Sequence, residues 1–267
     1  MDLTRVADYE ITAPLAEGNH GAFFLARPPA RLGLTDDVVV VKVMTGAHDG
    51  AHRHLVRELR AFTAAESPFL VPLFDAGQAG DVFFYSMRYF PRGSLADASA
   101  SMTLGERIRA VADAAEAAHA LHEIGLTHRD IRPGNILVHD GGACLADLAL
   151  AIEADESAAM TTLASIDAVG YVDPAYLRGE PPSRATDVFS LGAVLHEMVT
   201  GTPIYPDLPA DPLLAMRAAL RSSPRIDPSV NPGPGDVLRR CLSARLEERP
   251  TTALALAEEL RTLADAP

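Results

Sequence analysis

The segment from Val38 to Met44 constrains the fold more than any other part of the chain. Apart from Lys42, it consists of valines and one methionine. A short aliphatic run of this kind is typical of a β-strand buried on both faces. A lone ammonium in such a strand costs free energy unless an anion compensates it. The segment therefore predicts a central strand of a sheet, with a partner for Lys42 close by.

The candidate partner is Glu58, in a segment from 49 to 65 that we expect to be helical. Glu58 shares the apolar helix face that carries Leu59 and Phe62, so it needs a cation as much as Lys42 needs an anion. A second interpretation stays open on these residues alone. In it, Lys42 reaches solvent at a strand end and Glu58 pairs with a neighbouring arginine.

The apolar periodicity divides the chain into two halves. The first half is predicted to hold strands at 22–26, 38–44, 69–74 and 82–89 beside the one helix. After the break at Pro91-Arg92-Gly93-Ser94, we expect helices at 103–125, 186–200, 211–222, 234–243 and 251–264, and short strands at 136–138 and 143–145. A small β-rich half followed by a larger α-rich half indicates the α+β class. We expect an N-terminal lobe over residues 1–90 and a C-terminal lobe over residues 91–267.

Composition excludes several classes of protein. The formal net charge of -13 argues against a nucleic-acid or anionic-membrane surface. No apolar run approaches the ~20 residues of a membrane span. The two cysteines, Cys144 and Cys241, are interpreted as reduced, buried thiols, and residues 1–5 lack a secretory pattern. We therefore expect a cytoplasmic domain that holds any bound polyanion with a few placed cations and backbone amides.

A second polar cluster, His-Arg-Asp-Ile-Arg-Pro-Gly-Asn at 128–135, joins a predicted helix to a predicted strand. Asp147 follows shortly after it and interrupts an apolar segment. Asn135 and Asp147 carry the oxygen atoms that a hard divalent cation prefers beside phosphate. Each feature alone also fits an ordinary loop, in which the Asn or Asp side chain caps a turn.

In this order and spacing, the features resemble the protein kinase family over residues 9 to 264. The matches are Val-Val-Val-Lys at 39–42, His-Arg-Asp at 128–130, Asp-Leu-Ala at 147–149, Asp-Val-Phe-Ser-Leu-Gly at 187–192 and Arg-Pro at 249–250. Aminoglycoside-phosphotransferase-like enzymes share the catalytic loop but lack the last two motifs, so the protein-kinase branch is favoured. The resemblance implies the bilobal protein-kinase fold, with a small β-rich N-lobe and a larger α-rich C-lobe.

The resemblance also implies a role for each matching residue. Lys42 would hold the α- and β-phosphates of ATP, and Glu58 would hold that lysine. Asp130 would accept the proton of the substrate hydroxyl, with Arg132 near the transferred phosphoryl group. The residues implied to bind nucleotide or Mg²⁺ are Gly18 and Gly21 of a glycine-rich loop, Phe23, Val40, Met87 and Tyr89 around the adenine, and Asn135 and Asp147 at the metal.

Several positions depart from the family pattern. Phe23 stands where a valine usually covers the adenine, and Ala149 replaces the glycine that usually follows the metal-binding Asp. Arg132 replaces a lysine, and Asp167-Ala168 replaces a Gly-Thr pair, so a threonine hydroxyl near Asp130 is missing.

The end of the activation segment departs as well. Ala175 replaces a glutamate that usually pairs with the arginine at position 249. Arg249 therefore needs another anion or access to water. Glu180 and Glu247 are the candidates, and the sequence does not choose between them.

The residues for magnesium and phosphate are thus complete, whereas those that shape the peptide site are altered. The sequence predicts a Ser/Thr protein kinase that uses ATP and Mg²⁺ and acts on a protein substrate or signalling partner. An ATP-binding pseudokinase scaffold and a small-molecule kinase remain as alternatives. Four hydroxyl residues, Ser157, Thr161, Thr162 and Ser165, are candidate phosphorylation sites acting through Arg129, or simply belong to a polar loop.

Overall fold

The computed structural model describes the chain except for residues 1–3, 19–20, 46–58, 60–61, 148–165 and 267. Apart from those gaps, it forms two compact units, one of residues 4–64 and 71–91 and the other of residues 65–70, 92–147 and 166–266. Within the described residues, no helix is both long and apolar enough to span a bilayer. The α+β class expected from the sequence is confirmed.

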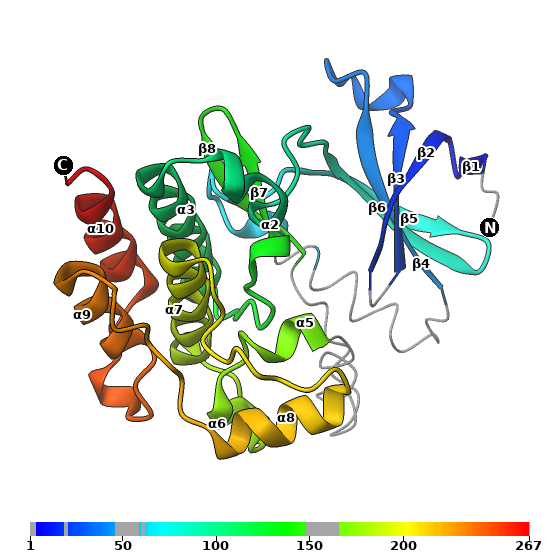
Figure 1. The fold of residues 1–267 in the computed structure, drawn as a ribbon. Coiled ribbons are helices and arrows are strands. Elements are labelled where there is room, and N and C mark those ends of the chain that lie inside the picture. The colour runs from blue at the N-terminus through cyan, green and yellow to red at the C-terminus, as the bar shows by residue number, and fades with distance from the viewer. Residues whose placement is uncertain (1–3, 19–20, 46–58, 60–61, 148–165, 267) are drawn as a thin grey trace. The chain divides into compact units, whose positions relative to one another are not determined.

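The N-terminal unit is an antiparallel sheet with the strand order β1-β2-β3-β4-β6-β5 (Figure 1). Its strands are β1 (Arg5–Val6), β2 (Tyr9–Gly18), β3 (Gly21–Arg27), β4 (Val39–Thr45), β5 (Leu73–Ala79) and β6 (Val82–Arg88). The strand predicted at 69–74 is misplaced, because β5 begins only after Pro72 and continues to Ala79. Proline has no N–H to donate to a ladder, so it belongs at the border of the strand.

Strand β4 is buried on both faces, as the sequence predicts. Val39 and Val41 are 0% exposed on one face, and Val40 and Lys42 are 2% and 4% exposed on the other. The first face packs on Tyr9 and other apolar side chains of the same sheet. The second face carries the only charged side chain of the strand.

The C-terminal unit is mainly helical (Figure 1). Its helices are α2 (Leu95–Ala98), α3 (Leu104–Glu123), α5 (Ile166–Val169), α6 (Pro174–Leu177), α7 (Arg184–Thr200), α8 (Pro212–Arg221), α9 (Pro232–Cys241) and α10 (Ala253–Ala264). A hairpin of β7 (Ile136–His139) and β8 (Gly142–Leu145) lies against α3. Helix α3 also packs on α7 and α10, so it forms the centre of the unit.

Local sequence explains where these helices begin and how closely they approach. Helix α3 begins at a capping box, in which Glu106 N donates to Thr103 Oγ1 at 3.2 Å and Thr103 N donates to Glu106 Oε2 at 2.7 Å. On α7, a Cβ at Gly192 would lie 2.5 Å from Cys241 Cβ. A glycine is therefore required where α7 meets α9. Cys144 and Cys241 are both buried thiols, as predicted.

His196 joins three segments of the C-terminal unit. Its Nδ1 lies 2.9 Å from Thr202 O, and its Nε2 accepts a hydrogen bond from Asp227 N at 3.1 Å. This pattern requires the neutral ring with its proton on Nδ1. Burial is the main cause that lowers the pKa of His196 below 6.5.

The lowered pKa predicts a stability that depends on pH. Because the unfolded ring titrates near 6.5, the contribution is complete above that pH and is lost as pH falls toward the folded pKa. We expect the melting temperature to fall between pH 7.5 and pH 5, and to fall less steeply in His196→Gln, which carries no titratable ring. Differential scanning fluorimetry across this range measures both slopes. Parallel slopes would contradict the assignment.

Candidate active site

The loop at 128–135 is fixed by a buried carboxylate at the start of α7. Asp187 is 0% exposed. Its Oδ2 accepts from His128 N at 2.8 Å, and its Oδ1 accepts from Arg129 N at 2.9 Å. The ring of His122, at the end of α3, adds a third contact, with Nε2 2.7 Å from Asp187 Oδ2. One carboxylate therefore ties the loop to both α3 and α7.

His128 connects the same loop to the segment that precedes Asp147. The ring is fully buried, and its Nε2 lies 3.0 Å from Ala146 O. Because a carbonyl only accepts, Nε2 carries the proton. Burial is the leading cause that lowers the pKa of His128. Because the ring is fully buried and directs Nε2 to a carbonyl, we interpret it as a structural donor.

Asp130 lies at the centre of a small polar cluster. Asn135 Nδ2 donates to Asp130 Oδ2 at 2.8 Å and to Asp130 O at 2.7 Å. Arg132 Nε forms an ion pair with Asp130 Oδ1 at 3.3 Å. Burial raises the pKa of the Asp130 carboxyl, and the nearby Arg132 charge opposes that rise. The result is a partly exposed carboxylate, oriented by two neighbours, whose affinity for a proton is increased.

The two predicted metal ligands lie close together in the fold. Ala146 N donates to Asn135 O at 2.8 Å, and Asp147 is the next residue along the chain. Asp147 has a φ of 58°, in the left-handed region. Asn135 directs its amide nitrogen to Asp130, so its amide oxygen is the atom that can serve a cation. An amide oxygen and a carboxylate fit Mg²⁺.

In the N-terminal unit, the predicted nucleotide residues share one face of the sheet. Phe23 pairs with Lys42 across β3 and β4, Lys42 pairs with Tyr85 across β4 and β6, and Val40 pairs with Met87. Residues two apart in a strand point to the same face. Tyr89 follows β6 and is partly exposed.

The glycine-rich segment forms the hairpin between β2 and β3. Gly18 and Gly21 are paired where the strands meet, and residues 19 and 20 between them lie outside the described residues. Gly21 has a φ of 145°, and a Cβ there would lie 2.2 Å from Val43 O. Only glycine fits this close approach of β3 to β4.

Lys42 is buried between two aromatic rings. Its Nζ lies 4.8 Å from the centroid of Phe23 and 5.8 Å from that of Tyr85. Both distances are in the range of cation–π contacts. Glu58, the predicted carboxylate partner, lies outside the described residues, so that ion pair stays a prediction. The four candidate phosphorylation sites, Ser157, Thr161, Thr162 and Ser165, also lie outside them, as does Ala149.

The anion that pairs with Arg249 is neither candidate from the sequence. Asp173 Oδ2 lies 2.5 Å from Arg249 Nη1, and both side chains are 2% exposed. Glu180 and Glu247 instead pair with exposed arginines beside them. The prediction was therefore wrong in its candidates, although it was right that Arg249 needs a new partner. The acidic partner therefore lies two residues before Ala175, the position at which the family pattern has a glutamate.

Arg249 and Asp173 make further contacts besides their ion pair. The guanidinium donates to the carbonyls of Ala185 and Ser243 at 2.8 and 2.9 Å and lies 5.2 Å from the ring centroid of Phe189. Asp173 also accepts from Ala175 N at 2.9 Å and so caps α6. One pair thus connects the segment before α6 with α7 and the segment before α10.

A pocket of about 390 Å³ lies next to the loop at 128–135, within the C-terminal unit. Arg132 and Tyr171 line it, together with Glu197 and Tyr205. Tyr171 Oη donates to Glu197 Oε2. Sequence reasoning missed Glu197, Tyr205 and Tyr85 as site residues. It also passed over one signal, since Lys42 is the only lysine in the sequence.

Comparison with known proteins supports the resemblance to the protein kinase family. A family model described as "Protein kinase domain" matches residues 9–260. The probable serine/threonine-protein kinase pknA2 of Bifidobacterium longum is 28% identical over 96% of this chain and 35% of its own length. The probable serine/threonine-protein kinase PkwA of Thermomonospora curvata is 30% identical over 96% and 34%, respectively. The serine/threonine-protein kinase PknB of Mycolicibacterium smegmatis is 27% identical over 94% of this chain and 42% of its own length. The chain thus spans well under half the length of these relatives.

Proposed function

Because the chain belongs to the protein kinase family, we propose that it transfers the γ-phosphoryl group of Mg-ATP to a serine or threonine hydroxyl of a protein. The observation that carries this proposal is the cluster around Asp130, whose carboxylate is oriented by Asn135 and Arg132. Phosphoryl transfer requires mainly positioning and charge stabilisation, and this cluster supplies both.

Each residue of the cluster has a defined task in the proposed reaction. Asp130 orients the substrate hydroxyl and accepts its proton. Arg132 keeps a positive charge beside the acceptor, where the family usually has a lysine. Asn135 and Asp147 would hold magnesium, which would neutralise phosphate charge. On the N-terminal unit, Lys42 contacts the phosphates.

Two observations support a protein as the acceptor. The pocket beside Arg132 is large enough for side chains of a bound segment, and Tyr171 and Glu197 give it hydrogen-bonding groups. In addition, the relatives are named as serine/threonine-protein kinases. The buried thiols of Cys144 and Cys241 fit a reducing compartment, so we propose that this domain is cytoplasmic.

The experiment for this proposal measures where labelled phosphate goes. The protein is incubated with Mg-[γ-³²P]ATP and either generic protein substrates or a panel of small hydroxyl metabolites. We expect label on protein serine or threonine. Label on metabolites alone would identify a small-molecule kinase. Nucleotide binding without any transfer would identify a scaffold.

Arg132 provides a specific prediction for the same assay. Arg132→Met removes the charge but keeps much of the length, and we expect kcat to fall about 100-fold because a charge-stabilising donor is lost. Arg132→Lys keeps the charge and should retain most activity. The control is Arg92→Met, which removes an arginine that pairs with the exposed Asp140. A kcat for Arg132→Met equal to that of the control would contradict the role.

A further inference from the structure

Lys42 is set apart by composition as well as by position. It is the only lysine in the sequence, and the other 22 of the 23 Lys and Arg residues are arginines. Arginine carries a broad, planar and weakly hydrated guanidinium, whereas lysine carries a compact and strongly hydrated ammonium. A retained lysine therefore indicates a place that requires a compact ammonium rather than a long planar guanidinium.

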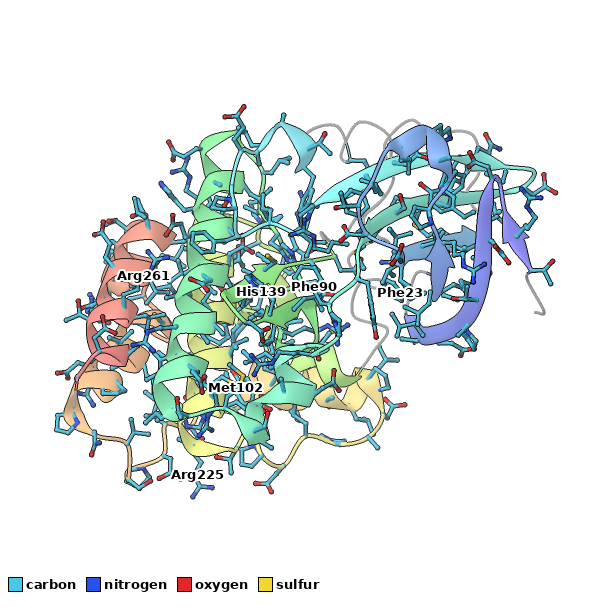
Figure 2. All side chains as sticks on the ribbon, turned by 90° about the horizontal axis from the view of Figure 1, so that it is seen from above. Phe23, Phe90, Met102, His139, Arg225 and Arg261 are labelled. Carbon is cyan, nitrogen blue, oxygen red and sulfur yellow. The ribbon has the colours of Figure 1, made fainter. Side chains whose placement is uncertain are left out.

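The surroundings of Lys42 explain this requirement. Phe23 and Tyr85 are its direct neighbours on the two adjacent strands, one on each side. Lys42 is 4% exposed and Tyr85 is 3% exposed, and Phe23 is partly buried. Figure 2 shows Phe23 on its strand. The ammonium thus lies between two rings in a space that little water reaches.

An aromatic ring has a negative face and attracts a desolvated cation more strongly than an exposed one. The Phe23 centroid, at 4.8 Å from Nζ, gives the closer contact, and the Tyr85 centroid, at 5.8 Å, gives the longer one. A valine at position 23, which the family pattern favours, has no such face. The phenylalanine therefore adds an interaction with the cation that the usual residue does not provide.

We propose that Phe23 and Tyr85, together the aromatic bracket, are positioning residues that fix the Lys42 ammonium for contact with nucleotide phosphate. Its effect on phosphate binding rests on the proposed function, whereas the two cation–π contacts do not. Its two cation–π contacts, one from each neighbouring strand, fix the position of the Lys42 ammonium and the direction of the Lys42 side chain. Phe23 was expected to lie around the adenine. In this proposal it instead acts on the phosphate end of the nucleotide, through Lys42.

The first test observes Lys42 directly and needs neither nucleotide nor activity. Protein grown with ¹³C- and ¹⁵N-labelled lysine gives a single set of lysine side-chain signals, because the chain has one lysine. We expect its methylene protons to show an upfield shift from the rings, and Phe23→Leu and Tyr85→Leu each to remove part of that shift. The matched control is Phe24→Leu, one residue along the strand in the core on the opposite face, which should leave the signal in place. A lysine signal at the ordinary solvent position in the wild type would overturn the bracket.

The second test measures the consequence for phosphate binding. Phenylalanine analogues with one, two and three ring fluorines at position 23 keep the shape of the ring but weaken its negative face. We expect the affinity for Mg-ADP, taken relative to that for adenosine, to fall stepwise by about twofold to thirtyfold in total. In Lys42→Met the same series should be flat, because the bracket then has no cation to hold.

The two tests separate failure of the bracket from failure of the proposed function. A shifted lysine signal in a protein that never transfers phosphate would keep the bracket and reject the kinase activity. A flat fluorine series in the wild type, or an equal slope in Lys42→Met, would reject the bracket whatever the activity.

Discussion

Asp130→Asn lowers kcat for phosphate transfer about 10²- to 10⁴-fold and leaves the Kd of Mg-ATP unchanged. The amide keeps the size and the position of the carboxyl group but cannot accept a proton from the substrate hydroxyl. The protein should remain as stable as the wild type, because burial already disfavours the charged form of Asp130. Initial rates and isothermal titration calorimetry measure the two quantities.

The control for Asp130→Asn is the same chemical change at Asp140, a fully exposed residue of the C-terminal unit. Asp140→Asn should retain wild-type kcat. The pH profile adds a signature, since the raised pKa of Asp130 predicts that kcat/KM increases with pH through that raised value on the acid side. Equal kcat for the two variants would show that Asp130 is not the base.

Asp173→Ala should destabilise the protein by about 3–5 kcal/mol, because it leaves the buried guanidinium of Arg249 without its carboxylate. For a chain of this size the loss corresponds to a melting temperature lower by roughly 6–20 °C. Asp236→Ala, which breaks an exposed pair with Arg239, should cost no more than about 1 kcal/mol. Thermal and denaturant unfolding provide the comparison.

A rescue variant makes this prediction more specific. Asp173→Ser combined with Ala175→Glu moves the acid to the position that the family pattern favours, and serine still caps α6. We expect the double variant to recover at least half of the lost melting temperature. If Asp173→Ala is no less stable than Asp236→Ala, the pair does not hold this region together.

Much of the fold follows from local sequence. The long helices have an apolar stripe and clear starting residues, such as Thr103 and Glu106 before α3, so their positions are predictable within a few residues. Strand β5 was harder to place. Part of the apolar segment that predicted it precedes Pro72 and lies outside the strand. The strand itself includes Gly77 and Gln78, which have little preference for strands and are held by β6.

The candidate site also has residues that the sequence predicts and residues that it does not. Asp130, Asn135 and Asp147 are close in sequence, so the order of motifs was enough to select them as candidates. The partner of Arg249 was not predictable, because the choice among Asp173 and two glutamates depends on how α6 meets α7. The aromatic bracket was also missed, since it requires the register of three strands at once.

The most direct test of the central claim compares γ-phosphate incorporation by the wild type and by Lys42→Arg at saturating Mg-ATP. The substitution removes the only lysine and preserves the net charge. Our account predicts phosphoserine or phosphothreonine with the wild type and about 100-fold less with Lys42→Arg. Equal incorporation by the two proteins, or nucleotide binding with no incorporation by either, would contradict it.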